Sequence, residues 1–264
     1  MSKGEETKNR ILFVARDLFY EYGFHKTTAR MISEKANTNL GLLNYYFKNK
    51  NEMGLIIYSS IRDRFDELIA EYFPDMDELT LFLFSSTLEL YLCITNEKYG
   101  NFFHEFIGGE PKNRRFIQEH ISDVFCRYSS EYAQTPEYTM LATISISAIK
   151  PAVVDYVLNH KDEIKTDTYL RYYLEQQLHF LGHNKSEADS YIEKVHKCCT
   201  TFYTGYDTTC LKTKMKGPLH RCSCYLKSYP HHALLLLDLL LQYLQAQYFL
   251  CCHAVYDRAC ILNI

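Results

Sequence analysis

Apolar residues recur at spacings of three and four along most of this 264-residue chain, which is the period of amphipathic helices. The first such stripe lies within residues 5–22 and consists of Ile11, Val14, Ala15, Leu18, Phe19 and Tyr22. Gly23 follows it directly and is predicted to be the C-terminal cap of the first helix. A longer stripe predicts a helix over residues 51–73, which Pro74 ends.

Helical patterns continue through the rest of the first 201 residues. Further helices are predicted over residues 75–95, 99–107, 111–132, 136–160, 166–181 and 186–201. Pro136 suits the first turn of its helix, whereas Pro151 lies inside the same pattern and is expected to kink or split it. Hairpin turns and sustained alternation are missing, so the predicted fold class is all-α.

Residues 27–47 predict two short helices joined by a tight turn. Thr27 or Thr28 can cap the first helix, whose apolar face consists of Ala29, Ile32 and Ala36. The pattern breaks at Asn37, and Asn is the non-glycine residue that best tolerates the left-handed conformation of a tight corner. The chain is therefore expected to turn there.

The second short helix has one apolar and one open face. Leu40, Leu43 and Phe47 form the face expected to be buried, and the outward side is made of Gly41, Leu42, Asn44 and Tyr45. Asn49 and Glu52 then resemble a capping box at the start of the long helix. Lys48 and Lys50 flank this helix start, and because cations oppose the helix dipole there, a bound anion is predicted to offset them.

A helix, a turn, an outward-facing helix and flanking lysines suit insertion into a DNA major groove with phosphate contacts on each side. Over residues 8–55 the segment resembles the DNA-binding domain of the tetracycline-repressor (TetR/AcrR) family of transcriptional regulators. The matching residues are Thr27, Thr28, Ile32, Ala36, Gly41, Leu43, Tyr45, Tyr46, Phe47, Lys50, Glu52 and Met53. Asn37, Thr38 and Asn44 depart from the usual glycine, valine and tyrosine of the family. The third departure is expected to change operator preference or one phosphate contact.

The resemblance implies a helix-turn-helix DNA-binding domain over residues 1–50 and a helical ligand-binding and dimerisation domain over residues 51–201. The DNA contacts it implies come from both short helices and the segment after them: Thr27, Thr28, Arg30, Asn39, Leu40, Gly41, Leu42, Asn44, Tyr45, Tyr46, Lys48 and Lys50. The partner is double-stranded DNA with an inverted-repeat operator. The expected function is that of a repressor, released from its operator by a small apolar or aromatic effector; activation remains an alternative.

The family also implies an effector pocket and a two-fold interface in the body. The pocket candidates are the aromatic and neighbouring side chains Phe65, Phe102, Phe103, His104, Glu105, Phe106, Tyr128, Tyr132 and Met140. The candidates for the homodimer interface are Leu141, Ile144, Ile146, Ile149, Val153, Val157, Tyr169, Tyr172, Tyr173 and Gln176. In each case the alternative is an ordinary core residue.

Charge is unevenly distributed, although the formal net charge is only −3. Residues 1–53 carry nine Lys and Arg against six Asp and Glu, whereas residues 54–193 carry twelve against twenty-three. A basic N-terminal segment beside an acidic body fits DNA contact confined to one end.

Residues 202–264 form an extension of different composition. No Glu follows Glu193, and eight of the ten cysteines lie beyond residue 197. Three interpretations remain open: a zinc site, although no recognised Cys/His spacing is present; a membrane segment around residues 234–241, although Asp238 makes it costly; and a non-homologous extension with an apolar helix.

An enzyme and a protein-interaction module are the two alternatives to a regulator. The sequence carries no nucleophile elbow, phosphate-binding loop, dinucleotide fingerprint or His-Glu-x-x-His helix, so an enzyme is not expected. An all-α protein-interaction module without a DNA role is the remaining alternative. No cofactor, metal or membrane partner is expected, and the polar N-terminal segment predicts a cytoplasmic protein.

Overall fold

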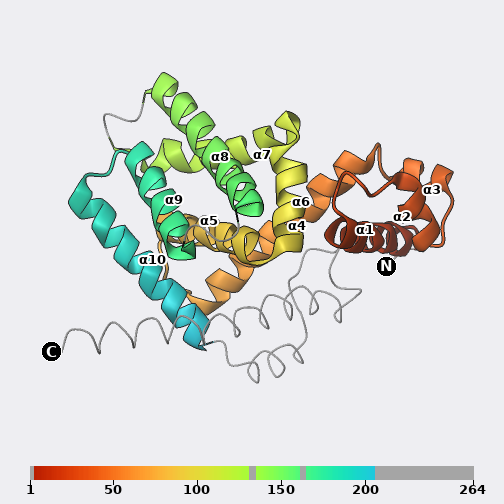
Figure 1. Cartoon of the computed structure of the whole chain (residues 1–264), viewed down its shortest axis with the longest axis horizontal. Helices are drawn as coiled ribbons and strands as arrows, with labels where there is room; N and C mark the ends of the chain where they lie inside the picture. Colours follow the sequence, from red (N-terminus) through yellow and green to blue (C-terminus); the bar gives the residue numbers. More distant parts are fainter. Residues whose placement is uncertain (1–2, 131–134, 161–164, 206–264) are drawn as a thin grey trace. The chain divides into compact units, whose positions relative to one another are not determined.

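The computed structural model of the chain describes residues 3–130, 135–160 and 165–205 (Figure 1). Every regular element in these ranges is a helix, and no strand occurs among them. The predicted all-α fold is confirmed. Contacts group residues 1–196 into one compact unit, whereas the extension from residue 206 onward lies outside the described residues. The domain boundaries at residues 50 and 201 therefore remain predictions.

Three helices form the N-terminal group: α1 (Lys3–Tyr22), α2 (Ala29–Lys35) and α3 (Leu40–Tyr46). The apolar stripe of α1 is buried against α2, with Ile11, Leu18 and Phe19 almost inaccessible. Gly23 ends α1 with a positive φ of 87°, as its predicted role of C-terminal cap requires.

Asn37 makes the corner between α2 and α3. Its φ is 49°, and it is the only non-glycine residue with positive φ in the described part of the chain. The backbone N–H groups of Asn37 and Thr38 donate to the carbonyls of Glu34 and Ser33, which closes the last turn of α2. The predicted left-handed corner is confirmed.

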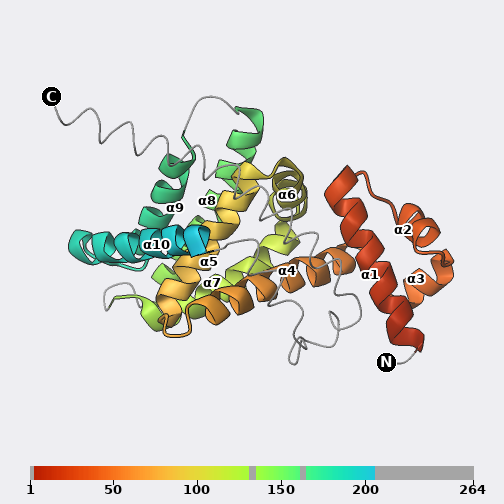
Figure 2. The same cartoon turned by 90° about the horizontal axis from the view of Figure 1, so that it is seen from below.

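The long helix α4 (Lys50–Tyr72) leads from this group into the rest of the unit (Figure 2). The predicted cap is present with one partner shifted: the Asn49 side chain accepts from the Glu52 N–H at 2.9 Å, but the Glu52 carboxylate accepts from the N–H of Lys48, the residue before the cap, at 2.6 Å. The helix packs on α1 near its start and on α5 further along.

Six α-helices and one π-helix follow α4. They are α5 (Glu78–Thr95), α6 (Glu97–Phe103), the π-helix η1 (His104–Gly108), α7 (Pro111–Tyr128), α8 (Pro136–Asn159), α9 (Thr166–Phe180) and α10 (Lys185–Gly205). Helix α5 is the centre of this bundle, because α4, α6, α7, α8 and α9 all pack on it.

Two details of the body differ from the sequence expectations. The helix predicted over residues 99–107 is divided into α6 and the π-helix, and Gly100, expected to mark a break, lies inside α6. Pro151 does not split α8, which is one continuous helix from Pro136 to Asn159. Neighbouring helices bury Pro151 and supply the packing that keeps the helix together.

Within the described residues, α5 and α8 are both long and apolar enough to span a membrane by length and composition. This is weak evidence for a membrane protein, because the core helix of a globular fold passes the same test. In α5, 72% of the most apolar stretch of the helix is buried inside the protein, whereas in α8 the buried share of the corresponding stretch is 39%. Helix α5 is therefore a core helix, whereas α8 keeps an open apolar face.

The corner at Asn37 gives a first testable prediction. Replacing Asn37 by Val should destabilise the protein by about 1–2 kcal/mol, because a β-branched residue is strained at positive φ. Asn37→Gly should be neutral or slightly stabilising, since glycine adopts this conformation without strain. Urea unfolding of the two variants measures the difference, and equal stability would contradict a left-handed corner.

Candidate nucleic-acid interface and internal pocket

Helix α3 is attached to the domain by one side only. Leu43 and Phe47 are each 1% exposed, α3 packs on α2, and the ammonium of Lys8 in α1 lies 5.8 Å from the centre of the Phe47 ring. On the opposite side Gly41 and Asn44 are exposed, and the Tyr45 side chain is 80% exposed. The outer face of α3 is therefore open to a partner.

Hydrogen bonds at the helix starts fix how this face is presented. The Asn39 side chain accepts from the Leu42 N–H at 2.7 Å and caps α3. Thr28 likewise caps α2 by accepting from the Met31 N–H at 3.2 Å. Both capping residues are exposed, as a contact with DNA phosphates requires.

Three of the remaining predicted DNA contacts are only partly available. Arg30 is exposed but forms an ion pair with Glu34 at 2.9 Å, one helical turn away. Leu42 and Tyr46 are half-buried, and the Tyr46 ring packs edge-on against Tyr45.

Two of the predicted residues are placed differently from expectation. Thr27 is completely buried, and its hydroxyl bonds to the carbonyls of Leu18 and Gly23, so its side chain cannot reach DNA. Leu40 was expected on the buried face of α3, but its side chain is 45% exposed. It belongs instead to the open side, near the start of the helix.

Lys50 also has a different environment from the one predicted. Its ammonium donates to the carbonyls of Phe24 at 2.7 Å and Thr27 at 2.9 Å, and lies 4.3 Å from the centre of the Phe24 ring. Burial lowers its pKa, which Glu105 and Glu110 partly counteract. Backbone carbonyls, rather than a bound anion, therefore offset this cation, whereas Lys48 is fully exposed.

The loop after α1 is joined to the π-helix of the body. The Glu105 carboxylate accepts from the His25 N–H at 2.7 Å, and the Phe106 ring packs on Phe24 with 4.9 Å between centroids. Gly54 of α4 lies so close to Phe106 that an added Cβ would meet the ring at 2.4 Å. Aromatic packing and one charged hydrogen bond thus connect the helix-turn-helix to the body.

Most of the predicted pocket residues belong to the core or the surface. Phe65, Phe102 and Phe106 are buried and are not part of the lining of the pocket described below, and the hydroxyl of Tyr128 donates to Glu78. His104 is half-exposed, with its Nδ1 3.6 Å from Asp155, and Met140 is exposed. Tyr132 lies outside the described residues. Phe103 alone of these candidates lines the pocket found between the helices.

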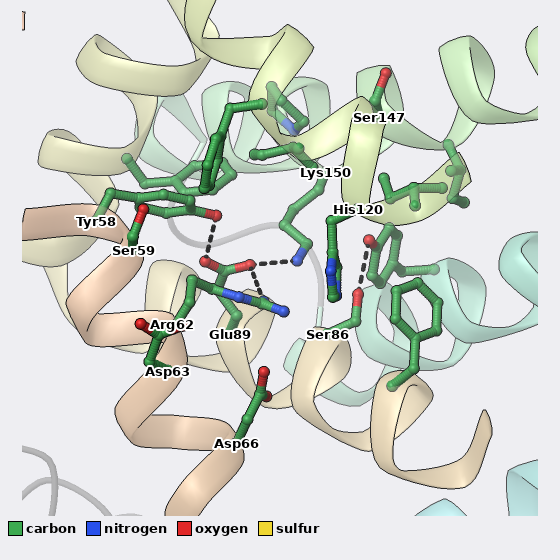
Figure 3. Close-up of a pocket in the computed structure, with 18 residues that line it drawn as sticks. Tyr58, Ser59, Arg62, Asp63, Asp66, Ser86, Glu89, His120, Ser147 and Lys150 are labelled. Carbon is green, nitrogen blue, oxygen red and sulfur yellow. Dashed lines mark hydrogen bonds and ion pairs between the residues drawn. The ribbon is translucent and has the colours of Figure 1, made fainter. Parts of the chain in front are cut away.

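This pocket has a volume of about 120 Å³ and lies among α4, α5, α7, α8 and α9. At its centre is Glu89 of α5, whose side chain is 1% exposed. Figure 3 shows Tyr58 and Arg62 of α4, and Lys150 of α8, pointing toward its carboxylate. The separations are 2.8 Å from the Tyr58 hydroxyl, 2.9 Å from Arg62 and 2.6 Å from Lys150.

These charges persist despite their burial. Burial alone would raise the pKa of Glu89, but Lys150 and Arg62 lower it to about 2. Burial would lower the pKa of Lys150, but Glu89 more than compensates, so the pKa is raised. The carboxylate and both cations are therefore ionised at neutral pH.

Sequence reasoning missed this network because it searched for aromatic rings. A signal was present, however. Glu89 is the only charged residue in the apolar stretch 79–95, and Lys150 is the only one in residues 138–154. An ionisable residue inside an apolar helical pattern is either paired or functional.

The geometry of α1 to α3, with a left-handed corner and an open second helix, defines a helix-turn-helix domain. Residues 11–54 match the family model described as "Bacterial regulatory proteins, tetR family". The helix-turn-helix of this chain is therefore similar to that of bacterial regulatory proteins of the tetR family, and the match covers the N-terminal helices and the start of α4.

Solved structures with similar folds were also found. RolR in complex with resorcinol is 19% identical with a TM-score of 0.49, and the match covers 72% of this chain and 94% of that one. SmeT, the repressor of the Stenotrophomonas maltophilia multidrug efflux pump SmeDEF, is 16% identical with a TM-score of 0.46 over 65% and 88% of the two chains. A putative transcriptional regulator from Pseudomonas aeruginosa PAO1 is 14% identical with a TM-score of 0.46 over 69% and 93%.

At these identities the likenesses carry no argument about ligand or partner. A search of curated proteins found no match to this sequence.

The inward position of Lys50 predicts a structural rather than a DNA-binding role. Lys50→Met should destabilise the protein by about 1–3 kcal/mol, because it removes charged hydrogen bonds to two carbonyls. Lys48→Met is the matched control and should leave stability unchanged within about 0.5 kcal/mol, since its side chain is exposed. Urea denaturation checks both, and equal stability of the two variants would refute the role assigned to Lys50.

Proposed function

We propose that the protein is a repressor that inserts α3 into the major groove of an inverted-repeat operator and releases it when a small molecule occupies the internal pocket. The observation that carries the proposal is the open outer face of α3, with Tyr45 80% exposed. A helix that were only part of a core would bury these aromatic and amide groups, and the exposed Lys48 beside them is suited to a phosphate contact.

The exposed side chains divide by the contacts they can make. Asn44 and Tyr45 lie on the outward side of α3, where they are suited to base edges. Thr28, Asn39 and Lys48 lie at helix starts and are suited to phosphates. Arg30, Leu40, Gly41, Leu42 and Tyr46 complete the proposed interface, whereas Thr27 and Lys50 support it from inside.

A homodimer is proposed because an inverted repeat requires paired reading heads. Support comes from the open apolar face of α8, where Met140, Leu141 and Ile144 are exposed, together with Tyr172 on the neighbouring α9. The interface predicted from the sequence also included Ile146, Tyr169 and Tyr173, but these residues are buried inside the protein.

Helix α4 is the proposed route from the pocket to DNA. It begins beside the helix-turn-helix at Lys50 and contributes Tyr58 and Arg62 to the pocket. An occupant that displaced these side chains would move a helix whose first turns pack on α1 and Phe106. Such coupling requires that the binding free energy of the small molecule differ by only about 1–3 kcal/mol between the two positions of α4.

Operator binding tests the proposed readout. Asn44→Ala and Tyr45→Ala should each weaken binding to the inverted repeat by about 1–3 kcal/mol while leaving binding to random duplex unchanged. Lys48→Ala should weaken both and reduce the salt slope by about one unit, because it loses a phosphate contact. Fluorescence anisotropy with labelled duplexes at several salt concentrations measures these effects.

A chain that bound no inverted repeat from the promoter of its own gene more tightly than random DNA would instead be an interaction module.

The dimer is tested by placing a charge on the open face of α8. Ile144→Glu should give monomers in sedimentation equilibrium and weaken operator binding about 100-fold or more, because the second head no longer binds from the same complex. Ala70→Glu, at an exposed site on α4, is the control and should change neither property. Persistence of dimers in the Ile144 variant would rule out this interface.

A further inference from the structure

The carboxylate at the centre of the pocket has no capacity left for a ligand. Glu89 accepts hydrogen bonds from Tyr58, Arg62 and Lys150, and a longer one from the Tyr99 hydroxyl at 3.4 Å. An ionised carboxylate offers about four acceptor positions, so all of them are in use. A cationic or donor-rich ligand therefore gains nothing from Glu89.

Arg62 and Lys150, in contrast to Glu89, keep hydrogen-bonding capacity. Among the described residues, Glu89 is the only carboxylate that pairs with Arg62 or Lys150 within 4.0 Å. A guanidinium has five N–H donors and an ammonium has three, whereas Glu89 takes one from each. Among these three residues the charges therefore sum to one excess positive charge, and both cations keep N–H donors that Glu89 does not accept.

The other charged groups of the pocket lie nearer to solvent. Asp63 is exposed and Asp66 half-exposed, and in Figure 3 both lie on the side of Glu89 away from Lys150. Asp66 also accepts from the Ser85 hydroxyl. His120 is held neutral because burial, followed by the charge of Arg62, lowers its pKa. The charges of Asp66 and Asp63 interact with Arg62, whereas Glu89 is the carboxylate that raises the pKa of Lys150.

The rest of the lining is apolar and largely aromatic. Phe82, Phe103, Phe116 and Ile146 contribute apolar surface, and Lys150 lies 5.2 Å from the centre of the Tyr173 ring. A volume of about 120 Å³ is somewhat smaller than that of an engineered cavity of roughly 150 Å³ that binds benzene. The comparison limits a ligand to one ring.

We propose that the pocket binds a small aromatic acid, whose carboxylate accepts hydrogen bonds from Lys150 and Arg62 while its ring packs among the phenylalanines. The inference rests on the proposed function only in taking this pocket as the effector site. It narrows the effector from any small apolar or aromatic molecule to an organic anion with about one ring.

A ligand series on the full-length wild-type chain tests the charge requirement. Benzoate, benzamide and benzylamine share a ring and differ in charge, and calorimetric titration measures each affinity. Benzoate should bind at least about tenfold more tightly than benzamide, since only the carboxylate forms charge-assisted bonds, and benzylamine should not bind. Acetate, which lacks the ring, should bind more weakly than benzoate.

Equal affinity for benzamide or benzylamine overturns the proposal, as does failure of benzoate to bind at millimolar concentration.

Variants then assign the contact to the buried cation. Lys150→Met should reduce benzoate affinity about tenfold or more, and Lys150→Arg, which keeps the charge, should retain most of it. Lys112→Met, at an exposed site on α7, is the matched control and should bind like the wild type. Circular dichroism establishes that each variant is folded. Should Lys150→Met not fold, the ligand series alone decides the question.

Gel shift with the operator separates this inference from the proposed function. Benzoate binding by a chain that does not recognise an operator would contradict the regulatory role and leave the anion site standing. Operator binding by a chain that does not bind benzoate would contradict the anion site and leave the regulatory role standing.

Discussion

The attachment of α3 through a single apolar side is the constraint on which the DNA-binding account depends. A helix of seven residues does not fold in isolation, so α3 exists only because Leu43 and Phe47 are buried in the N-terminal core. All of its anchoring is on that side, and the corner at Asn37 and the cap at Asn39 fix its direction. The outer face, with Tyr45, is thereby left without a packing role and is free for recognition.

In the body, the buried ion network around Glu89 is the interaction that fixes the linking helix α4. It joins α4 to α5 and α8 through Arg62 and Lys150, and breaking a buried pair of this kind costs about 3–5 kcal/mol. The network therefore holds the linking helix firmly, and a ligand that binds Arg62 and Lys150, as proposed above, would act on this same helix. Gly54, four residues before Tyr58 on α4, lies against Phe106 of η1, and Phe106 in turn packs on Phe24 beside the helix-turn-helix.

Local interactions explain which features were predictable from the sequence. The Asn37 corner, the Asn49–Glu52 cap and the Gly23 cap each involve residues at most five positions apart, so the pattern of residue types was sufficient. Lys50 and Thr27 are polar residues of a kind usually exposed, but their side chains point inward because they hydrogen-bond to backbone carbonyls. For Lys50 these are the carbonyls of Phe24 and Thr27, more than twenty residues earlier.

The pocket could not be assembled from local patterns for the same reason. Glu89 and Lys150 are 61 residues apart, and Arg62 is 27 residues from Glu89. The aromatic residues chosen from the sequence were correctly apolar, but helix packing placed most of them in the core. Phe103 alone lines the cavity among those described, and the charged residues that define its chemistry were single exceptions in apolar stretches.

The structure of the chain bound to an operator duplex tests the central claim most directly. The account predicts two copies of α3 in successive major grooves about 34 Å apart, with Asn44 and Tyr45 at base edges and Lys48 at a phosphate. A complex in which the outer face of α3 lies away from the duplex, or is covered by the protein, would contradict it.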